Sequence, residues 1–297
     1  MTNHLVSVVM ITFGHEKYIE ESINGVLSQV LEGKIELLIS DDCSPDDTER
    51  IVNKIIAEHP NGSWIKYIKH SENKGAIPNF AWSISQAKGK YIAICEGDDY
   101  WTDPLKLQKQ IDFLDHNKDY SICFHHVDEV DENGKLISEK IIQSEIEEKE
   151  YTIDDLSKGN FIHTPSVVFR KNVQTLPDFF IFSPLGDYPL HMINASYGKI
   201  KYFPDTMAVY RVGAGIWSSQ TRIFKVINTL FTLKLLISYF YSATEIKKEL
   251  TGQYNHLIEE LESLKNSPVQ SHENIAYNLP LKKLFIIILK KIKHLLS

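Results

Sequence analysis

Residues 91–99 read YIAICEGDD, so an unbroken apolar run passes directly into three carboxylates. A short apolar run of this kind is typical of a strand that is buried on both faces of a parallel sheet. In such sheets, ligands bind beyond the carboxyl ends of the strands, near the point where the strand order reverses. The stretch therefore predicts a buried strand over 91–95 and a polar site directly after it.

The segments upstream of this strand repeat the same pattern. Three further apolar runs read as strands, at residues 7–12, 35–40 and 65–68. Apolar residues at helical spacing lie between the strands, over 19–30, 51–56 and 79–87. Strands that alternate with helices in this way predict a doubly wound, mainly parallel α/β sheet.

The pattern changes after about residue 104. We expect a helix over 107–114, a strand over 120–127, an exposed acidic loop or hairpin edge over 139–150, and helices alone after Ser219.

The chain of 297 residues is 43% hydrophobic and carries a net charge of −7. This apolar fraction excludes intrinsic disorder. The charge is unevenly distributed along the chain. Residues 220–297 carry 11 Lys or Arg and 6 Asp or Glu, whereas residues 1–219 carry 21 Lys or Arg and 33 Asp or Glu. An acidic main body with a net charge of −12 argues against a nucleic-acid partner.

Three cysteines, Cys43, Cys95 and Cys123, have no CxxC spacing and are expected to be reduced thiols in a cytoplasmic protein. The first residues enter an apolar strand without a basic region or cleavage site, so we expect no signal peptide. The sequence has no histidine spacing typical of metal sites, and it has no GxGxxG, GxxxxGK[ST] or GxSxG motif. Dinucleotide oxidoreductases, P-loop ATPases and α/β-hydrolases are therefore not leading candidates.

The acidic turn, residues 96–99, is the strongest candidate for a site. Glu96, Asp98 and Asp99 would repel one another unless a cation or a hydrogen-bond donor lies between them. Carboxylate oxygens, together with substrate phosphates, are the ligands that Mg²⁺ and Mn²⁺ prefer. Gly97 allows a close approach of the backbone. The alternative is a solvated loop without a ligand.

Three other polar residues each leave two interpretations open. Asp41, after the strand over 35–40, could accept a hydrogen bond from a ligand base or serve turn and helix-cap chemistry. Asp187 could act in a site or cap the apolar helix over 190–195. Arg211, in a glycine-containing segment, could close over a diphosphate or lie in an ordinary linker to the C-terminal part.

Six stretches of the chain, in this order, resemble the family 2 glycosyltransferases, which have the GT-A fold. They are residues 6–14, 40–48, 73–75, 87–91, 96–101 and 186–218. The Tyr100-Trp101 pair after the acidic turn is similar to the bacterial polysaccharide-synthesis members. The resemblance covers about the first 220 residues and implies a GT-A domain, with a Rossmann-like, mainly parallel sheet, followed by a helical extension.

The resemblance implies a binding site for a nucleotide-sugar donor, most often a UDP-sugar. Thr12 and Phe13 would line the base and ribose, and Asp41 would hydrogen-bond the uracil ring. Asn73 belongs to a donor-binding stretch, and Glu96 stands at a ribose-contacting position.

The resemblance also implies the reacting groups. Asp98 and Asp99 match the last two acids of the family's acidic motif and would hold Mn²⁺ or Mg²⁺, with Asp99 the principal ligand. Asp187 matches the catalytic base that removes the acceptor hydroxyl proton, and Arg211 would contact the donor diphosphate. Displacement of this kind inverts the anomeric carbon of the transferred sugar.

Two positions depart from the family pattern. Gly14 stands where many relatives have an Asn near the base, and Gly213 stands where many have a His that contacts the metal. These differences fit a nucleotide-binding relative with a scaffolding role and impaired activity, but the retained acidic turn and Asp187 argue against it. A sugar-1-phosphate nucleotidyltransferase would need a Gly-rich, basic phosphate loop, which residues 12–16 do not provide.

We expect a GT-A catalytic domain over 1–219 and a helical region over 220–297. Residues 281–296 place lysines on one half of a helical wheel and apolar residues on the other, which is typical of a helix in an anionic membrane interface. Packing on its own domain or on a partner is the alternative. Residues 226–243 are too interrupted to span a bilayer and should form a packing helix.

These features predict a cytoplasmic enzyme that lies peripherally on the inner membrane face. It would use a glycan or lipid-linked saccharide as acceptor in cell-surface polysaccharide synthesis. Acceptor recognition is expected in residues 163–170 and 179–188.

Overall fold

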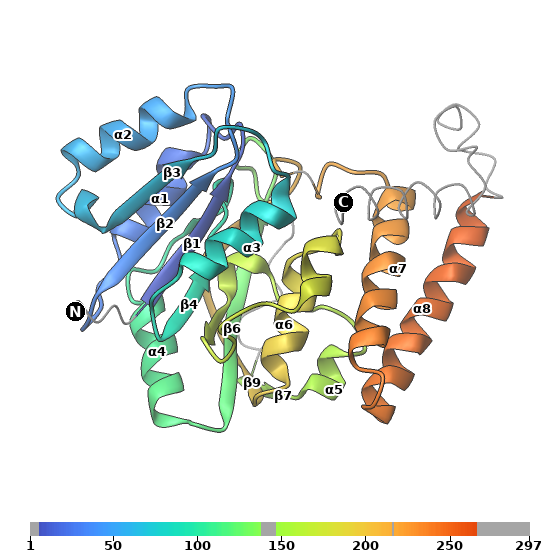
Figure 1. The fold of residues 1–297 in the computed structure, drawn as a ribbon. Helices are drawn as coiled ribbons and strands as arrows, with labels where there is room; N and C mark the ends of the chain where they lie inside the picture. Colours follow the sequence, from blue (N-terminus) through green and yellow to red (C-terminus); the bar gives the residue numbers. More distant parts are fainter. Residues whose placement is uncertain (1–5, 138–146, 216, 266–297) are drawn as a thin grey trace.

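A nine-stranded sheet runs through the centre of the protein (Figure 1). The computed structural model describes residues 6–137, 147–215 and 217–265. The strand order is β3-β2-β1-β4-β8-β6-β9-β5, and β7 pairs with β9 as well. The first half of the sheet consists of four parallel strands, β1 (Val6–Thr12), β2 (Ile35–Asp41), β3 (Ile65–Lys69) and β4 (Tyr91–Ile94).

The second half of the sheet is mixed. It contains β5 (Tyr100–Trp101), β6 (Tyr120–Val130), β7 (Lys149–Tyr151), β8 (Val168–Arg170) and β9 (Lys199–Arg211). Strand β8 is antiparallel to both β4 and β6, and β6 is parallel to β9. Strands β1, β4, β6 and β9 therefore point the same way, and their carboxyl ends meet at one edge of the sheet.

Helices cover both faces of the sheet. They are α1 (Ile19–Leu27), α2 (Thr48–Glu58), α3 (Ala76–Gln86), α4 (Lys106–His116), α5 (Ile153–Leu156), α6 (Asp187–Ala195), α7 (Arg222–Tyr239) and α8 (Thr244–Lys265). Successive strand residues point to opposite faces, so Val8 and Met10 join one core with α1, α2 and α4, whereas Val9 joins the other with α3 and α6.

Helices α7 and α8 form a hairpin that lies beside α6 (Figure 1). Leu233 of α7 and Leu250 of α8 are fully buried in the core that contains Leu190 of α6. The hairpin is therefore packed on the sheet domain through a shared core. Among the helices that the structure describes, none combines the length and apolar character needed to cross a membrane.

Most of the predicted elements are confirmed. The four parallel strands, the helices between them and the long helices after Ser219 form where the sequence predicts them. The three cysteines are free thiols. Residues 149–150 of the acidic stretch belong to β7, whereas residues 138–146 and the basic segment 281–296 lie outside the described residues.

Some elements were not predicted. The short strands β5 and β8 and the long strand β9 have no counterpart in the sequence analysis. Tyr210 and Arg211, expected in a glycine-containing loop, end strand β9 instead.

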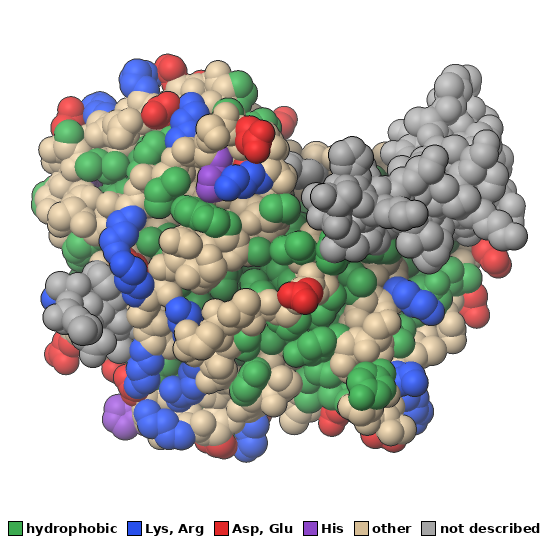
Figure 2. Space-filling view, in the orientation of Figure 1, with side chains coloured by type: hydrophobic (Ala, Val, Ile, Leu, Met, Phe, Trp, Pro, Cys, Tyr) green, Lys and Arg blue, Asp and Glu red, His purple; other side chains and the backbone are tan. Residues whose placement is uncertain are grey.

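The surface over α3 and α6 is largely apolar at its centre. Figure 2 shows hydrophobic side chains gathered over the middle of this face, with lysine and arginine side chains mostly around its edge.

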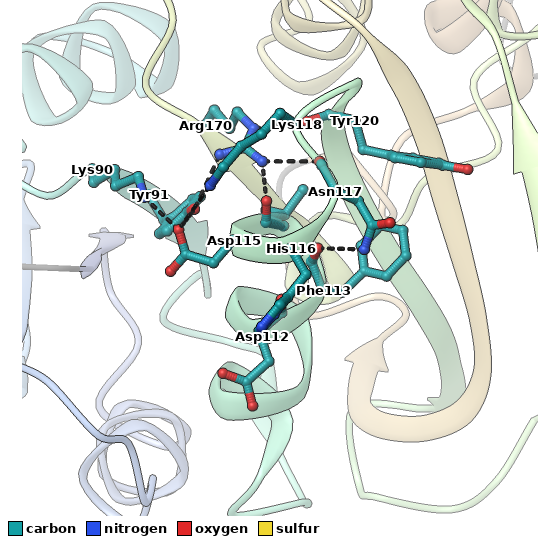
Figure 3. A network of polar contacts seen from close by, with 11 residues as sticks. Lys90, Tyr91, Asp112, Phe113, Asp115, His116, Asn117, Lys118, Tyr120 and Arg170 are labelled. Atoms are coloured by element: carbon teal, nitrogen blue, oxygen red, sulfur yellow. Dashed lines mark hydrogen bonds and ion pairs between the residues drawn. The ribbon is translucent and has the colours of Figure 1, made fainter.

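Arg170 of β8 ties the sheet to the end of α4 (Figure 3). Its guanidinium donates to the carbonyl oxygens of Leu114, Asn117 (3.0 Å) and Tyr120 (2.8 Å), and to the hydroxyl of Tyr91 (3.0 Å). The last carbonyls of a helix lack intrahelical partners, so this side chain supplies a donor to the carbonyl of Leu114 in the last turn of α4. The contact fixes α4 against β4 and β8.

Lys106 of α4 is fully buried in the core on the opposite side of the sheet from α6. Its Nζ donates to Oε1 of Gln110 at 2.8 Å and lies 4.1 Å from the centre of the Trp101 ring. Within the described part of the chain, no carboxylate forms an ion pair with it. Burial without a counter-ion lowers the pKa of Lys106 to about 7.

This buried amine predicts a pH-dependent stability. An unfolded lysine titrates near about 10.4, so between about pH 7 and pH 10 the unfolded state binds the extra proton. The free energy of unfolding of the wild type, relative to Lys106→Met, should therefore rise by up to about 1.4 kcal/mol per pH unit in this window. Urea unfolding of both proteins measures the difference. A difference that stays constant with pH would show that Lys106 keeps its proton in the folded state.

Candidate active site

A cavity of about 600 Å³ lies at the sheet edge where the carboxyl ends of β1 and β4 meet. Six predicted site residues line the cavity: Thr12, Phe13, Asn73, Glu96, Asp98 and Asp187. The other three are buried outside its lining: Asp41, Asp99 and Arg211. The structure thus brings together side chains that are up to 175 positions apart in the sequence.

The acidic turn places three carboxylates directly after the carboxyl end of β4. The ligand atoms of Glu96, Asp98 and Asp99 all lie within 4.8 Å of one another. Burial raises the pKa of Glu96 to about 8, and the charges of Asp98 and Asp187 add to the effect. Burial also raises the pKa of Asp99 well above its ordinary value, and its two acidic neighbours add to that shift. A cation between these groups would offset the repulsion and would favour the charged carboxylates.

Arg211 supports the acidic turn from the side away from the cavity. Its main-chain N–H donates to Oδ1 of Asp99 at 2.8 Å, and its Nε donates to the carbonyl oxygen of Asp98 at 2.9 Å. Its Nη2 donates to Oε2 of Glu21 in α1 at 2.6 Å. The guanidinium therefore already has partners within the protein, Asp98 and Glu21, and its expected contact with a diphosphate stays a prediction.

The acidic turn fits a small divalent cation. Oδ2 of Asp99 is buried and has no hydrogen-bond partner, which leaves one carboxylate oxygen free for a ligand. Asp98 faces the cavity, and the backbone of Gly215 lies against its Oδ2, since a Cβ there would be 2.7 Å away. Oxygen ligands in this number and spacing suit Mg²⁺ or Mn²⁺.

The loops after β2 and β3 also border the cavity. Asp42 lines it and accepts the backbone N–H groups of Lys74 (2.7 Å) and Gly75 (2.9 Å), so it holds the loop that carries Asn73. Asp41 instead accepts from the N–H of Ser44 at 2.7 Å and from the hydroxyl of Tyr67 at 2.6 Å. The sequence analysis named only Asp41 of this pair.

The first turn after β1 is packed tightly against the acidic turn. Thr12 Oγ1 and His15 Nδ1 are buried without a hydrogen-bond partner, and both residues line the cavity. A Cβ on Gly97 would lie 2.9 Å from Thr12 Oγ1 and 2.7 Å from His15 Nδ1. The close approach explains why glycine is required at position 97. The role of His15 in the lining was not predicted.

Asp187 stands at the start of α6 and faces the cavity. Gly186 is the residue that precedes the helix, and the Asp187 side chain makes no capping bond, so the alternative role as a helix cap is wrong. Its Oδ2 accepts from Nδ2 of Asn160 at 2.8 Å. Oδ1 of Asn160 in turn lies 3.3 Å from Nδ1 of His191. Burial lowers the pKa of His191 to about 4, so this imidazole is neutral and orients the amide without adding charge.

The remaining wall comes partly from the predicted acceptor regions and partly from helices that were not predicted to form a site. Of the two expected acceptor regions, Thr164 and residues 184–188 line the cavity. Helices α7 and α8 also contribute to the lining, through Phe224, Asn228, Thr229 and Gln253. No sequence motif marks these four side chains, because their position depends on how the hairpin packs.

Comparison with known proteins identifies relatives of this chain. The model of the family "Glycosyl transferase family 2" matches residues 7–175. An uncharacterized protein of Mycobacterium tuberculosis is 40% identical over 217 residues, which are 72% of this chain and 61% of the relative. The match therefore spans less than two thirds of that relative's length.

Two further proteins extend the comparison. WfaP of Escherichia coli, a UDP-Glc:α-D-GlcNAc-diphosphoundecaprenol β-1,3-glucosyltransferase, is 37% identical over 114 residues, 38% of this chain and 43% of WfaP. The crystal structure of Staphylococcus aureus TarS 1–349 in complex with UDP-GlcNAc superposes with a TM-score of 0.66 at 18% identity. It covers 90% of this chain and 77% of that one, and at this identity it shows a shared fold.

The close packing at Gly97 predicts a large cost for a single methyl group. Gly97→Ala forces Thr12 or His15 to move and should lower the free energy of unfolding by about 1–3 kcal/mol. Gly252→Ala in α8 is the control, since nothing lies within 4 Å of the added Cβ. Urea unfolding measures both variants, and equal stabilities would contradict the packing described for the acidic turn.

Proposed function

The chain belongs to glycosyl transferase family 2, and we propose that it moves a sugar from a nucleoside-diphosphate sugar to a hydroxyl group of a glycan or lipid-linked saccharide. The donor is a UDP-sugar, the anomeric carbon inverts, and the product belongs to a cell-surface polysaccharide. The observation that carries the proposal is one cavity lined both by Glu96 and Asp98 of the acidic turn and by the Asn160-bound Asp187.

The charge of the cavity supports an anionic donor with a cation. Asp42, Glu96, Asp98 and Asp187 line it, and no lysine or arginine does so among the residues that the structure describes. A nucleoside diphosphate is itself an anion, so a cation has to separate it from these carboxylates. Asp98 and Asp99 would hold Mn²⁺ or Mg²⁺, and the metal would neutralise charge that develops on the departing diphosphate.

The chain's own side chains account for the other steps. Thr12, Phe13, Asn73 and Glu96 line the end that would receive the base and ribose. Asp41 lies outside the lining, so its contact with the uracil ring would require Asp41 to exchange its bond with Tyr67.

Asp187 acts as the base. Asn160 donates to its Oδ2, which leaves Oδ1 to take the proton from the acceptor hydroxyl as that oxygen attacks the anomeric carbon. His191 contacts the carbonyl end of the Asn160 amide, so the amino end points at Asp187. The fixed amide orients the carboxylate before the acceptor arrives.

The relatives support the class of acceptor. The name of WfaP, which is 37% identical to this chain over 114 residues, specifies a diphosphoundecaprenol-linked sugar. An acceptor on a lipid carrier would require access to a membrane. We therefore assign the catalytic domain to 1–219 and a membrane-associating helical region to 220–297, at the cytoplasmic face.

The proposed base predicts a separation of binding from transfer. Wild-type protein should bind UDP in calorimetry only when Mn²⁺ or Mg²⁺ is present and should transfer sugar in a screen of nucleotide-sugars. Asp187→Asn should bind UDP as tightly, but transfer should fall by at least about 10²-fold, because the amide cannot take the proton.

Asp178→Asn, an exposed aspartate outside the cavity, is the matched control and should keep full activity. Transfer by Asp187→Asn at the wild-type rate would refute the base. Tight UDP binding without any divalent cation would refute the metal assignment.

The basic segment predicts membrane binding by the full chain. Residues 281–296 contain five lysines and no acidic residue. The full chain should float with vesicles that contain anionic lipid and should stay behind with purely zwitterionic vesicles, because each lysine near an anionic surface contributes about 1 kcal/mol. Deletion of residues 281–297 should abolish flotation, and equal flotation of both proteins would exclude this segment as the anchor.

A further inference from the structure

We propose that the first two turns of α7 form the acceptor subsite, and that this subsite binds an uncharged sugar ring in preference to an anionic one. The inference rests on the proposed function, because it takes Asp187 as the base that meets the acceptor. It differs from the sequence-based division of the chain, in which the helical region after residue 219 serves only membrane or partner binding.

The hairpin holds this wall in a fixed position. Nε2 of Gln253 in α8 donates to the hydroxyl of Tyr188 at 3.0 Å and to the carbonyl oxygen of Ser157. The hydroxyls of Ser183 and Thr232 lie 3.1 Å apart, within a buried part of the interface. Tyr188 is the residue after Asp187, so the same contacts fix the hairpin and the start of α6 relative to each other.

One face of α7 opens onto the cavity. Phe224, Asn228 and Thr229 line it. Phe224 and Asn228 are four residues apart and lie on neighbouring turns of one helix face, and Thr229 follows Asn228. Trp217, shortly before the helix, lines the same cavity. Helix α7 therefore lines the same cavity as Asp187, and the contacts to Tyr188 and Ser183 hold the hairpin beside the start of α6.

The chemistry of this face suits a sugar ring. Aromatic rings such as Phe224 and Trp217 offer apolar faces to the C–H groups of a pyranose. The Thr229 hydroxyl already donates to the carbonyl oxygen of Lys225 at 2.8 Å, and Asn228 Nδ2 donates to that of Phe224 at 2.8 Å. The Thr229 lone pairs and the Asn228 carbonyl oxygen can therefore accept hydrogen bonds from the hydroxyl groups of a neutral sugar, and the second N–H of Asn228 Nδ2 can donate one to a sugar oxygen.

The cations in the first two turns of this helix, Arg222 and Lys225, are directed elsewhere. Lys225 Nζ donates to the carbonyl oxygen of Ser218 at 3.0 Å, and Arg222 forms a two-pronged ion pair with Glu260 at 2.6 and 2.8 Å. Neither side chain lines the cavity. A carboxylate or phosphate on the acceptor ring would meet acceptor atoms and four lining carboxylates, which disfavours its binding.

The test compares cavity-facing variants with matched variants on the same helix. Phe224→Ala and Asn228→Ala remove the subsite, whereas Tyr239→Ala and Ser238→Ala change exposed residues of α7 outside the cavity lining. The probes are octyl β-glucoside and octyl β-glucuronide, whose binding is measured by saturation-transfer NMR in the presence of UDP and Mn²⁺. Calorimetry with UDP and Mn²⁺ reports the donor end separately.

We expect wild-type protein to bind the glucoside at least about tenfold more tightly than the glucuronide. In Phe224→Ala and Asn228→Ala, the affinity for the glucoside should fall by a similar factor, and the affinity for UDP should stay at the wild-type value. Both control variants should bind the two ligands as the wild type does. Asn228→Lys, which adds a cation to the wall, should raise the relative binding of the glucuronide.

Each contrary result has a distinct meaning. A parallel loss of UDP affinity in the cavity variants would place this wall in the donor site and overturn the inference. Equal binding of the two glycosides by the wild type, with no gain in Asn228→Lys, would overturn the preference for a neutral ring. Failure of the wild type to bind UDP with either metal would instead refute the proposed function.

Discussion

Mutual repulsion among the three carboxylates of the acidic turn is the constraint on which the site depends. Their ligand atoms lie within 4.8 Å of one another at the end of β4. The turn is held by Arg211 at the end of β9, which binds the backbone of Asp98, the side chain of Asp99 and Glu21 of α1 at once. Because β5, directly after the turn, pairs with β9, the second half of the sheet clamps a motif that belongs to the first half.

The sequence predicts the first half of the fold well, because its strands are short, apolar and separated by helices of regular period. The strands of the second half are harder to predict from the sequence. Strand β9 contains Pro204 and Asp205, residues that are depleted in strands, and its register with β6 shifts more than once. Strands β5 and β8 contain two and three residues, too few for any periodic signal.

The site shows the same division. Six of the nine predicted residues line the cavity, because strand ends converge wherever a parallel sheet forms. Which of two adjacent aspartates faces the cavity is decided by backbone geometry, so Asp42 rather than Asp41 lines it. Asn160 could not be found from the sequence either, since its bond to Asp187 joins residues 27 positions apart without a shared motif. The α7 wall depends on tertiary packing alone.

The uneven charge of the cavity has a consequence for the proposed function. Four carboxylates line the cavity and, within the described part of the chain, no lysine or arginine does. A bound divalent cation therefore reduces the repulsion that a nucleotide would meet, and a bound nucleotide adds to the negative charge that attracts the cation. Linkage requires the effect to be reciprocal, so the factor by which the cation tightens nucleotide binding equals the factor by which the nucleotide tightens cation binding. An uncharged acceptor wall then carries a separate advantage, because it adds a third ligand without disturbing this balance. The α7 wall is therefore distinguished from the carboxylate-lined part of the cavity by its lack of charge.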